Sequence, residues 1–147
     1  AYHLAKAGIT DVVVVEKSFI GAGSSGQSAS MLMKQVWTTH QVYFSLYCFE
    51  RFMAFEDELG TDPEYKRIGT LSIATKNIAE ASLAMAQMRQ DAGIETVMLS
   101  PEEVQQRYPV INVEDVVAGI WGPEDGIIEA QSIMLGYKDG ASRSGVE

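Results

Sequence analysis

One short stretch constrains the fold of this chain more than any other, residues 11–30, which read DVVVVEKSFIGAGSSGQSAS. Four consecutive valines end on a single acid, Glu16, and a loop of small residues follows. A continuous β-branched run is typical of a strand that is buried on both faces in a parallel sheet. Open α/β sheets bind ligands beyond the carboxyl ends of their strands, so Glu16 is predicted to face a ligand.

The ligand that this pattern indicates is a dinucleotide. In dinucleotide-binding folds, an acid at this place accepts hydrogen bonds from the hydroxyls of the adenosine ribose. The loop at 18–30 is rich in glycine and serine, so its backbone can approach a ligand closely. Its hydroxyl and N–H groups can donate to phosphate or flavin oxygens. A flexible surface linker remains an alternative interpretation of this loop.

Composition excludes several classes of partner. The chain has 147 residues and a net charge of -9, which argues against binding to nucleic acid or to an anionic membrane surface. No apolar run approaches the roughly 20 residues that a membrane span needs. Cys48 is the single cysteine, which excludes an internal disulfide and fits a reducing compartment. We therefore expect a cytoplasmic protein, and the sequence does not indicate its oligomeric state.

The rest of the chain predicts alternating helices and strands. Gly8 ends a first helix, Gly69 bends a pair of short strands, and Asn77 is expected to cap a helix. Ser100 opens a capping box with proline at the first helical position. The predicted helices are 1–7, 40–59, 78–92, 101–108 and 131–144, and the predicted strands are 11–16, 65–75, 95–99, 116–121 and 127–128.

These elements predict an α/β fold with an α+β insertion. Residues 1–60 are expected to form part of a Rossmann-like nucleotide-binding domain, and residues 61–129 part of a substrate domain. The helix in residues 130–147 would return to the first part. Both ends of the chain fall within regular patterns, so we expect a truncated fragment whose first strand and glycine-rich turn would precede Ala1.

Four segments together resemble one family. The resemblance is carried by these segments in their order along the chain: the helix and strand in 1–17, the loop in 21–31, the strand pair in 67–75, and the helix-and-turn segments in 99–111 and 124–147. In this order they are similar to the FAD-dependent oxidoreductases of the D-amino-acid oxidase type. That family includes glycine and sarcosine oxidases and dimethylglycine dehydrogenase.

The resemblance implies a cofactor, a reaction and a set of contacts. The cofactor would be FAD, and the reaction would be oxidation of the C–N bond of a small amine or (N-methyl) amino acid such as sarcosine, glycine or dimethylglycine. Core packing remains an equal alternative for Met31 and Leu32. The implied FAD contacts are Glu16 at the ribose with Lys17 beside it, Ser24, Ser25, Gln27, Ser28 and Ala29 at the pyrophosphate or the flavin edge, and Met31 and Leu32 at the flavin ring.

Three residues depart from the family pattern. Gln27 stands where relatives have arginine, or the histidine that attaches flavin covalently in the dimethylglycine dehydrogenase group. Covalent attachment through this position is therefore excluded, and FAD is expected to bind non-covalently there. Ser30 replaces the usual glycine, which questions the local backbone conformation. Ala130 replaces a proline, which is a milder change.

Other chemistry finds little support in the sequence. His3 and His40 are the only histidines, and neither has a partner at metal-ligand spacing, so no metal site is expected. The resemblance places substrate-carboxylate ligands outside the chain, and the catalytic residues stay unknown. Two alternatives remain open: a catalytically inert fragment that acts at most as a binding module, and an NAD(P)-dependent Rossmann enzyme.

Overall fold

The structure is a computed structural model that describes residues 1–146. These residues divide into two compact units. Unit 1 contains Ala1–Met31, Glu50–Tyr65 and the chain from Ile127 onward, and unit 2 contains Leu32–Phe49 and Lys66–Gly126. The expected assignment of 61–129 to a substrate domain stays a prediction, and Glu147 lies outside the described residues.

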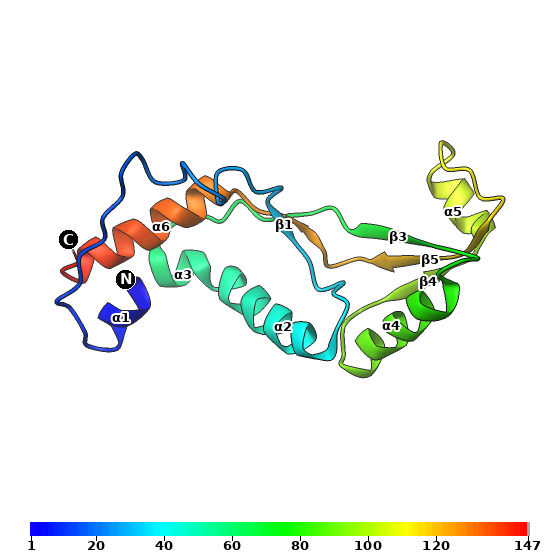
Figure 1. Cartoon of the computed structure of the whole chain (residues 1–147), viewed down its shortest axis with the longest axis horizontal. Helices are drawn as coiled ribbons and strands as arrows, with labels where there is room; N and C mark the ends of the chain where they lie inside the picture. Colours follow the sequence, from blue (N-terminus) through cyan, green and yellow to red (C-terminus); the bar gives the residue numbers. More distant parts are fainter. Residues whose placement is uncertain (147) are drawn as a thin grey trace. The chain divides into compact units, whose positions relative to one another are not determined.

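A three-stranded antiparallel sheet forms the centre of unit 2 (Figure 1). Its order is β3 (Thr70–Thr75), β5 (Val116–Gly122) and β4 (Val97–Leu99). Trp121 of β5 stands opposite Leu71 on one side and Val97 on the other. The middle strand is thus paired along both edges, as a central strand requires.

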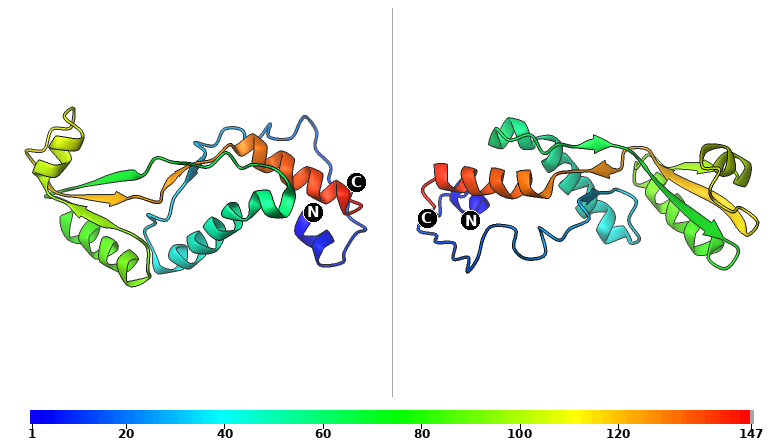
Figure 2. Two further views of the ribbon diagram at one scale, coloured as in Figure 1. Left: turned by 180° about the vertical axis from the view of Figure 1, so that it is seen from behind. Right: turned by 90° about the horizontal axis from the view of Figure 1, so that it is seen from above.

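Two helices cover the faces of β5 (Figure 2). Ala86 of α4 (Ala79–Asp91) packs in one buried cluster with Ala118 and Ile120. Side chains alternate between the faces of a strand, so Gly119 points to the opposite face. A Cβ on Gly119 would lie 3.3 Å from Leu99, and it would also meet the fully buried Val104 of α5 (Pro101–Arg107).

The starts of these two helices differ from each other in their caps. Ser100 accepts a hydrogen bond from the Glu103 N–H, and Glu103 accepts one from the Ser100 N–H, which confirms the predicted capping box. The predicted cap at Asn77 is wrong, because the N-cap of α4 is Ile78 and no side chain caps this helix. Residues 76–78 form a turn in which the Ile78 N–H donates to the Thr75 carbonyl at 3.0 Å, so the helix starts one residue later than predicted.

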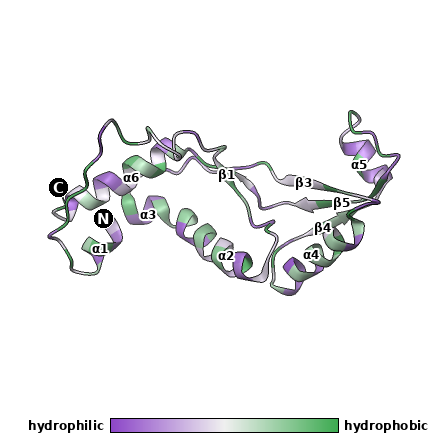
Figure 3. Cartoon of the chain, viewed as in Figure 1, coloured by the Kyte–Doolittle hydropathy of each residue, from purple (hydrophilic) through white to green (hydrophobic). Residues whose placement is uncertain are grey.

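In unit 1, α6 (Ala130–Arg143) packs against α1 (Tyr2–Lys6) and α3 (Phe55–Leu59). Figure 3 shows hydrophobic and hydrophilic residues alternating along α6. Two buried glycines permit the close approach. A Cβ on Gly136 would come within 2.6 Å of Phe55, and a Cβ on Gly140 within 2.5 Å of Leu59 and 3.1 Å of Tyr2. A bulkier residue at either position would therefore push the helices apart.

The carboxylate of Glu58 adds a polar contact between these helices. It accepts a hydrogen bond of 2.7 Å from the Tyr2 hydroxyl and contacts Lys6 Nζ at 2.5 Å. Arg51, near the end of α2 (Thr39–Met53), also forms an ion pair with Glu58. The predicted helix at 40–59 is confirmed as α2 and α3, which are separated at Ala54.

The strand predicted at 11–16 is wrong. These residues form neither helix nor strand, and Val13, Val14 and Val15 are 67%, 60% and 90% exposed. A buried strand needs partners for its backbone N–H and C=O groups. The described sheets have the orders β3-β5-β4 and β1 (Met31–Leu32)-β6 (Gly126–Ile127)-β2 (Lys66–Arg67), and neither includes this segment. The mixed α/β class itself is confirmed.

Candidate functional site

Unit 1 contains a pocket of about 720 Å³ beside Glu16. We call it the Glu16 pocket. Its walls come from the start of α1, from the segment that holds Val14 and Glu16, from Ile20, and from the second half of α6. The lining residues are Ala1, Tyr2, His3, Val14, Glu16, Ile20, Met134, Tyr137, Lys138, Ala141, Ser142 and Val146. Apolar walls with a few polar groups are typical of small-molecule sites.

Glu16 is oriented by the chain that follows it. Its carboxylate accepts a hydrogen bond of 2.8 Å from the Ser18 N–H, a local contact between a side chain and the backbone two residues along the chain. One carboxylate oxygen is used in this bond, and a carboxylate has further lone pairs to accept hydroxyl hydrogens. Glu16 is exposed, so it can reach a ligand that enters the pocket from solvent.

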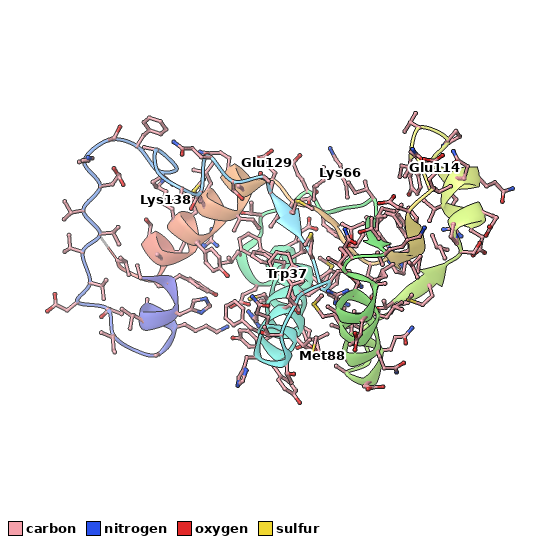
Figure 4. All side chains as sticks on the ribbon, turned by 45° about the vertical axis from the view of Figure 1, so that its right-hand side comes forward. Trp37, Lys66, Met88, Glu114, Glu129 and Lys138 are labelled. Atoms are coloured by element: carbon pink, nitrogen blue, oxygen red, sulfur yellow. The ribbon has the colours of Figure 1, made fainter. Side chains whose placement is uncertain are left out.

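The opposite wall of the pocket was not predicted from the sequence. Tyr137, Lys138 and Ser142 of α6 supply a phenol, an ammonium and a hydroxyl. Figure 4 labels Lys138 on this helix. The ring of Tyr137 lies 5.6 Å from both Tyr2 and His3, measured between ring centroids. It also meets Phe55 edge-on at 5.1 Å. This aromatic cluster fixes the ring that lines the pocket.

The glycine- and serine-rich loop is held at both ends. Gly21 packs against α6. A Cβ on Gly21 would lie 2.7 Å from Met134 and 3.0 Å from Gln131. At the other end, the Ser30 carbonyl accepts a hydrogen bond of 2.9 Å from the Ile128 N–H. Ser30 has a φ of 55°, the left-handed conformation that glycine adopts most readily. Ser30 thus adopts a backbone conformation that a glycine at this position would favour.

The predicted contact residues fall into three environments. Glu16 lines the pocket, whereas Lys17 and the loop residues Ser24, Ser25, Gln27, Ser28 and Ala29 are exposed to solvent. Met31 is 54% exposed and Leu32 is 7% exposed. The burial of Leu32 fits the core-packing alternative, and the exposure of Met31 does not. Of the predicted set, only Glu16 lines the pocket, and the roles of the others stay predictions.

The donor set of the Glu16 pocket fits a dinucleotide. A carboxylate beside hydroxyl and aromatic groups suits an adenosine ribose and its base. Backbone N–H groups of the exposed loop, whose glycines add no side chain, suit phosphate oxygens.

Within residues 1–146, no three His, Cys, Asp or Glu side chains gather to hold a metal ion. None of the helices described for these residues is long and apolar enough to cross a bilayer.

Comparison with known proteins identifies the family. The FAD dependent oxidoreductase family (DAO) matches residues 1–147, the whole chain, and the chain therefore belongs to this family. The mitochondrial pyruvate dehydrogenase phosphatase regulatory subunit of Mus musculus is 30% identical over 148 residues, covering 100% of this chain. The mitochondrial dimethylglycine dehydrogenase of Rattus norvegicus is 31% identical over 156 residues, covering 99% of it. The chain spans only 17% of the length of each of these two relatives.

A solved structure shows the same fold. The crystal structure of L-proline dehydrogenase from P. horikoshii superposes with a TM-score of 0.84 at 24% identity. The match covers 99% of this chain and 38% of that one. The superposition shows that the chain has part of the fold of that protein. The predicted membership of the D-amino-acid oxidase type is confirmed by the family match over residues 1–147.

Proposed function

We propose that this chain belongs to a flavoenzyme that oxidises the C–N bond of a small amine or N-methyl amino acid. The observation that carries the proposal is the position of Glu16. An acid predicted to bind ribose lines a pocket of about 720 Å³, in a chain whose whole length matches an FAD dependent oxidoreductase family. The relatives named above include a dimethylglycine dehydrogenase, which supports this substrate class.

In this proposal, each part of unit 1 has a role in holding FAD. Glu16 accepts hydrogen bonds from the adenosine ribose, and Tyr137 and Ser142 line the space beside it. Backbone N–H groups and hydroxyls of the exposed loop at 24–29 bind the pyrophosphate or the flavin edge. Gln27 has no nucleophilic group, so the cofactor is held there without a covalent bond.

The bound flavin supplies the acceptor for a hydride equivalent from the carbon next to the substrate nitrogen. The chain's own residues bind and orient; none of them is assigned a proton transfer. In this reaction the protein mainly has to place the reacting carbon of the substrate against the flavin.

FAD binding is the first test. The full-length protein is titrated with FAD, and its dissociation constant is compared with those of the E16A and E114A variants. Glu114 is an exposed acid on the loop before β5 and serves as the matched control (Figure 4). We expect E16A to weaken FAD binding at least about tenfold, because a charge-assisted hydrogen bond contributes on the order of 1.5–3 kcal/mol. Equal dissociation constants for E16A and E114A would show that Glu16 does not contribute to FAD binding.

Anaerobic reduction of the bound flavin tests the substrate class. Dimethylglycine, sarcosine and glycine are added separately to the flavin-loaded protein, and loss of the oxidised flavin absorbance is followed. We expect at least one of the three to bleach the flavin. A protein that binds FAD and is bleached by none of them would belong to the family without this activity.

A regulatory role is the second candidate, and one observation favours it. A relative at 30% identity is named as a regulatory subunit of a phosphatase. A protein with such a role can act through binding, as the predicted binding module would. FAD binding without bleaching by any amine would favour this candidate over the oxidase.

We also propose a cytoplasmic location, supported by a single cysteine, Cys48, which suits a reducing compartment. The two named relatives are mitochondrial proteins, so fractionation must separate these compartments. Recovery with a mitochondrial marker would overturn the proposal.

A further inference from the structure

The Glu16 pocket contains a positive group to which the proposed function gives no role. Lys138, in the second half of α6, lines the pocket together with Glu16. No other lysine or arginine side chain lines it among the residues that the structure describes. The pocket therefore offers a carboxylate on one wall and an ammonium on another. A ligand that uses both groups must carry hydrogen-bond donors and negatively charged acceptors.

The buried charges of unit 2 are, by contrast, already paired within the protein. Asp125 is 0% exposed and accepts a hydrogen bond of 2.8 Å from the Lys34 N–H. Arg89 is 3% exposed and donates from Nε to the Val36 carbonyl at 2.7 Å. Protein groups thus use both charges, and neither indicates a ligand. Lys138 differs from them because it lies on a pocket wall and is open to solvent.

Lys138 shares one face of α6 with a second polar group, the hydroxyl of Ser142. The two residues are four positions apart, so their side chains are neighbours on the helix surface. Both of them line the Glu16 pocket. An ammonium has three donors and a hydroxyl has one, and together these donors suit an anion that has several oxygens.

Close packing holds this part of α6 in place. Ala141 is 6% exposed and packs in one buried cluster with Ala5 of α1. Gly140 leaves no room for a Cβ, which would come within 2.5 Å of Leu59. The backbone next to Lys138 is thus fixed before a ligand arrives, and this lowers the entropic cost of binding.

The partner that Lys138 has within the chain is easily exchanged. Its Nζ lies 3.1 Å from Asp139 Oδ1, and both side chains are 52% exposed. An ion pair between such exposed groups contributes little to stability. Adjacent residues point to different sides of a helix, and Asp139 does not line the pocket. A ligand in the pocket can therefore replace Asp139 as the partner of Lys138 at little cost.

The glycine- and serine-rich loop meets the same face of α6 one turn earlier. A Cβ on Gly21 would lie 2.7 Å from Met134, which is four residues before Lys138. Ile20 and Met134 both line the Glu16 pocket. The loop that is predicted to bind the pyrophosphate or the flavin edge therefore reaches the helix face that carries Lys138.

We propose that Lys138 and Ser142 bind a phosphate group of the nucleotide whose ribose Glu16 holds. This role rests on the proposed function, which assigns the Glu16 pocket to the adenosine end of FAD. Ribose hydroxyls donate to a carboxylate, whereas phosphate oxygens accept from an ammonium and a hydroxyl. A nucleotide thus matches both charged groups of the pocket, and a nucleoside would leave Lys138 unused.

An ordinary surface lysine is the alternative account of Lys138. Such a side chain covers apolar neighbours with its stem and keeps its ammonium in water. Its removal would then change the affinity for every ligand of the pocket by the same small factor. A phosphate contact instead predicts a loss only for ligands that carry a phosphate, and this difference can be measured.

The test compares adenosine, AMP and FAD as ligands of the full-length protein without bound flavin. Their dissociation constants are measured by calorimetry, and inorganic phosphate is measured as a fourth ligand. K138M removes the ammonium and keeps most of the stem, whereas K138R keeps a positive charge. K76A removes an exposed lysine of unit 2 and serves as the matched control. S142A and E16A are measured alongside them.

We expect K138M to weaken the binding of AMP and FAD about tenfold and that of adenosine less than about twofold, because only the phosphate loses charge-assisted hydrogen bonds. K138R should recover most of this loss. S142A should weaken AMP binding about threefold, and K76A should stay within about twofold of the wild type for every ligand. E16A should weaken adenosine, AMP and FAD alike, since each of them carries the ribose.

The outcomes separate this role from the proposed function. Equal losses for adenosine and AMP in K138M, or no loss for either, would overturn the phosphate contact and leave the role of Glu16 intact. Inorganic phosphate that binds as tightly as AMP would assign Lys138 to free phosphate and also overturn the proposal. A wild-type protein that binds FAD but neither adenosine nor AMP would overturn this role alone. A wild-type protein that binds no FAD would overturn the proposed function, and this role with it.

Discussion

Two stretches of this chain have nearly the same sequence character and opposite structures. Residues 12–16 are four valines followed by Glu16, and residues 116–122 are Val-Val-Ala-Gly-Ile-Trp-Gly, followed at a short distance by Asp125. The first forms no strand, and its valines 13–15 are exposed. The second is β5, paired on both edges and covered on both faces, and its acid is fully buried.

The difference shows that β-branched residues favour a strand without determining one. Propensity in a strand mainly reflects packing against neighbouring strands and faces. β5 has β3 and β4 beside it and α4 and α5 over it, whereas no strand among residues 1–146 lies beside 12–16. The acid that ends each stretch follows the same rule, since Asp125 is buried in a network and Glu16 remains open to a ligand.

The largest effect that tests this comparison is expected in β5. Ile120 is 2% exposed and packs with Ala74, Ala86 and Ala118. We expect I120A to lower the free energy of unfolding by about 3 kcal/mol, through lost burial and the cavity that remains. Chemical denaturation followed by circular dichroism measures the change. A loss below 1 kcal/mol would mean that β5 is not the centre of a packed core.

An effect of intermediate size is expected from the acid after β5. Burial raises the pKa of Asp125, so the folded chain binds this proton more tightly than the unfolded chain does. The protonated carboxyl therefore stabilises the fold fully below the unfolded value of about 3.9, and this contribution is lost as pH rises through the raised pKa. We expect the stability of the wild type relative to D125N to fall over that range.

A second variant sharpens the same measurement. The Thr70 hydroxyl lowers the pKa of Asp125 by its hydrogen bond, so T70V should move the loss of relative stability to higher pH. Denaturation midpoints are recorded for the wild type, D125N and T70V from about pH 4 upward. Parallel curves for the wild type and D125N would show that Asp125 does not titrate differently in the folded chain.

Much of the fold could be predicted because its signals are local. Gly69 has a φ of 70° and separates two short strands, as its place in the sequence indicated. The Ser100 capping box and the helix at 40–59 likewise depend on residues within a few positions of one another. The cap at Asn77 failed because Ile78 takes the N-cap position instead.

The parts that escaped prediction depend on residues far apart in the chain. Glu16 could be identified as a candidate from the run of valines before it, but the other wall of its pocket comes from Tyr137 and Ser142. No local pattern says which helix packs beside a given segment. Arg89 was missed because charged residues usually face solvent. It lies three residues after the buried Ala86, and this spacing places both on one helix face.

The smallest effect is expected in the exposed valines, where the comparison with β5 is most direct. Val15 is 90% exposed, so V15A removes almost no buried surface and should change the free energy of unfolding by less than about 0.5 kcal/mol. The same denaturation measurement that detects the loss in I120A serves here, with both variants prepared in parallel. A cost for V15A as large as that of a core truncation would mean that residues 12–16 are buried in the protein in solution. Such a cost would then show that the β-branched run packs against other residues in solution, as the sequence pattern predicted.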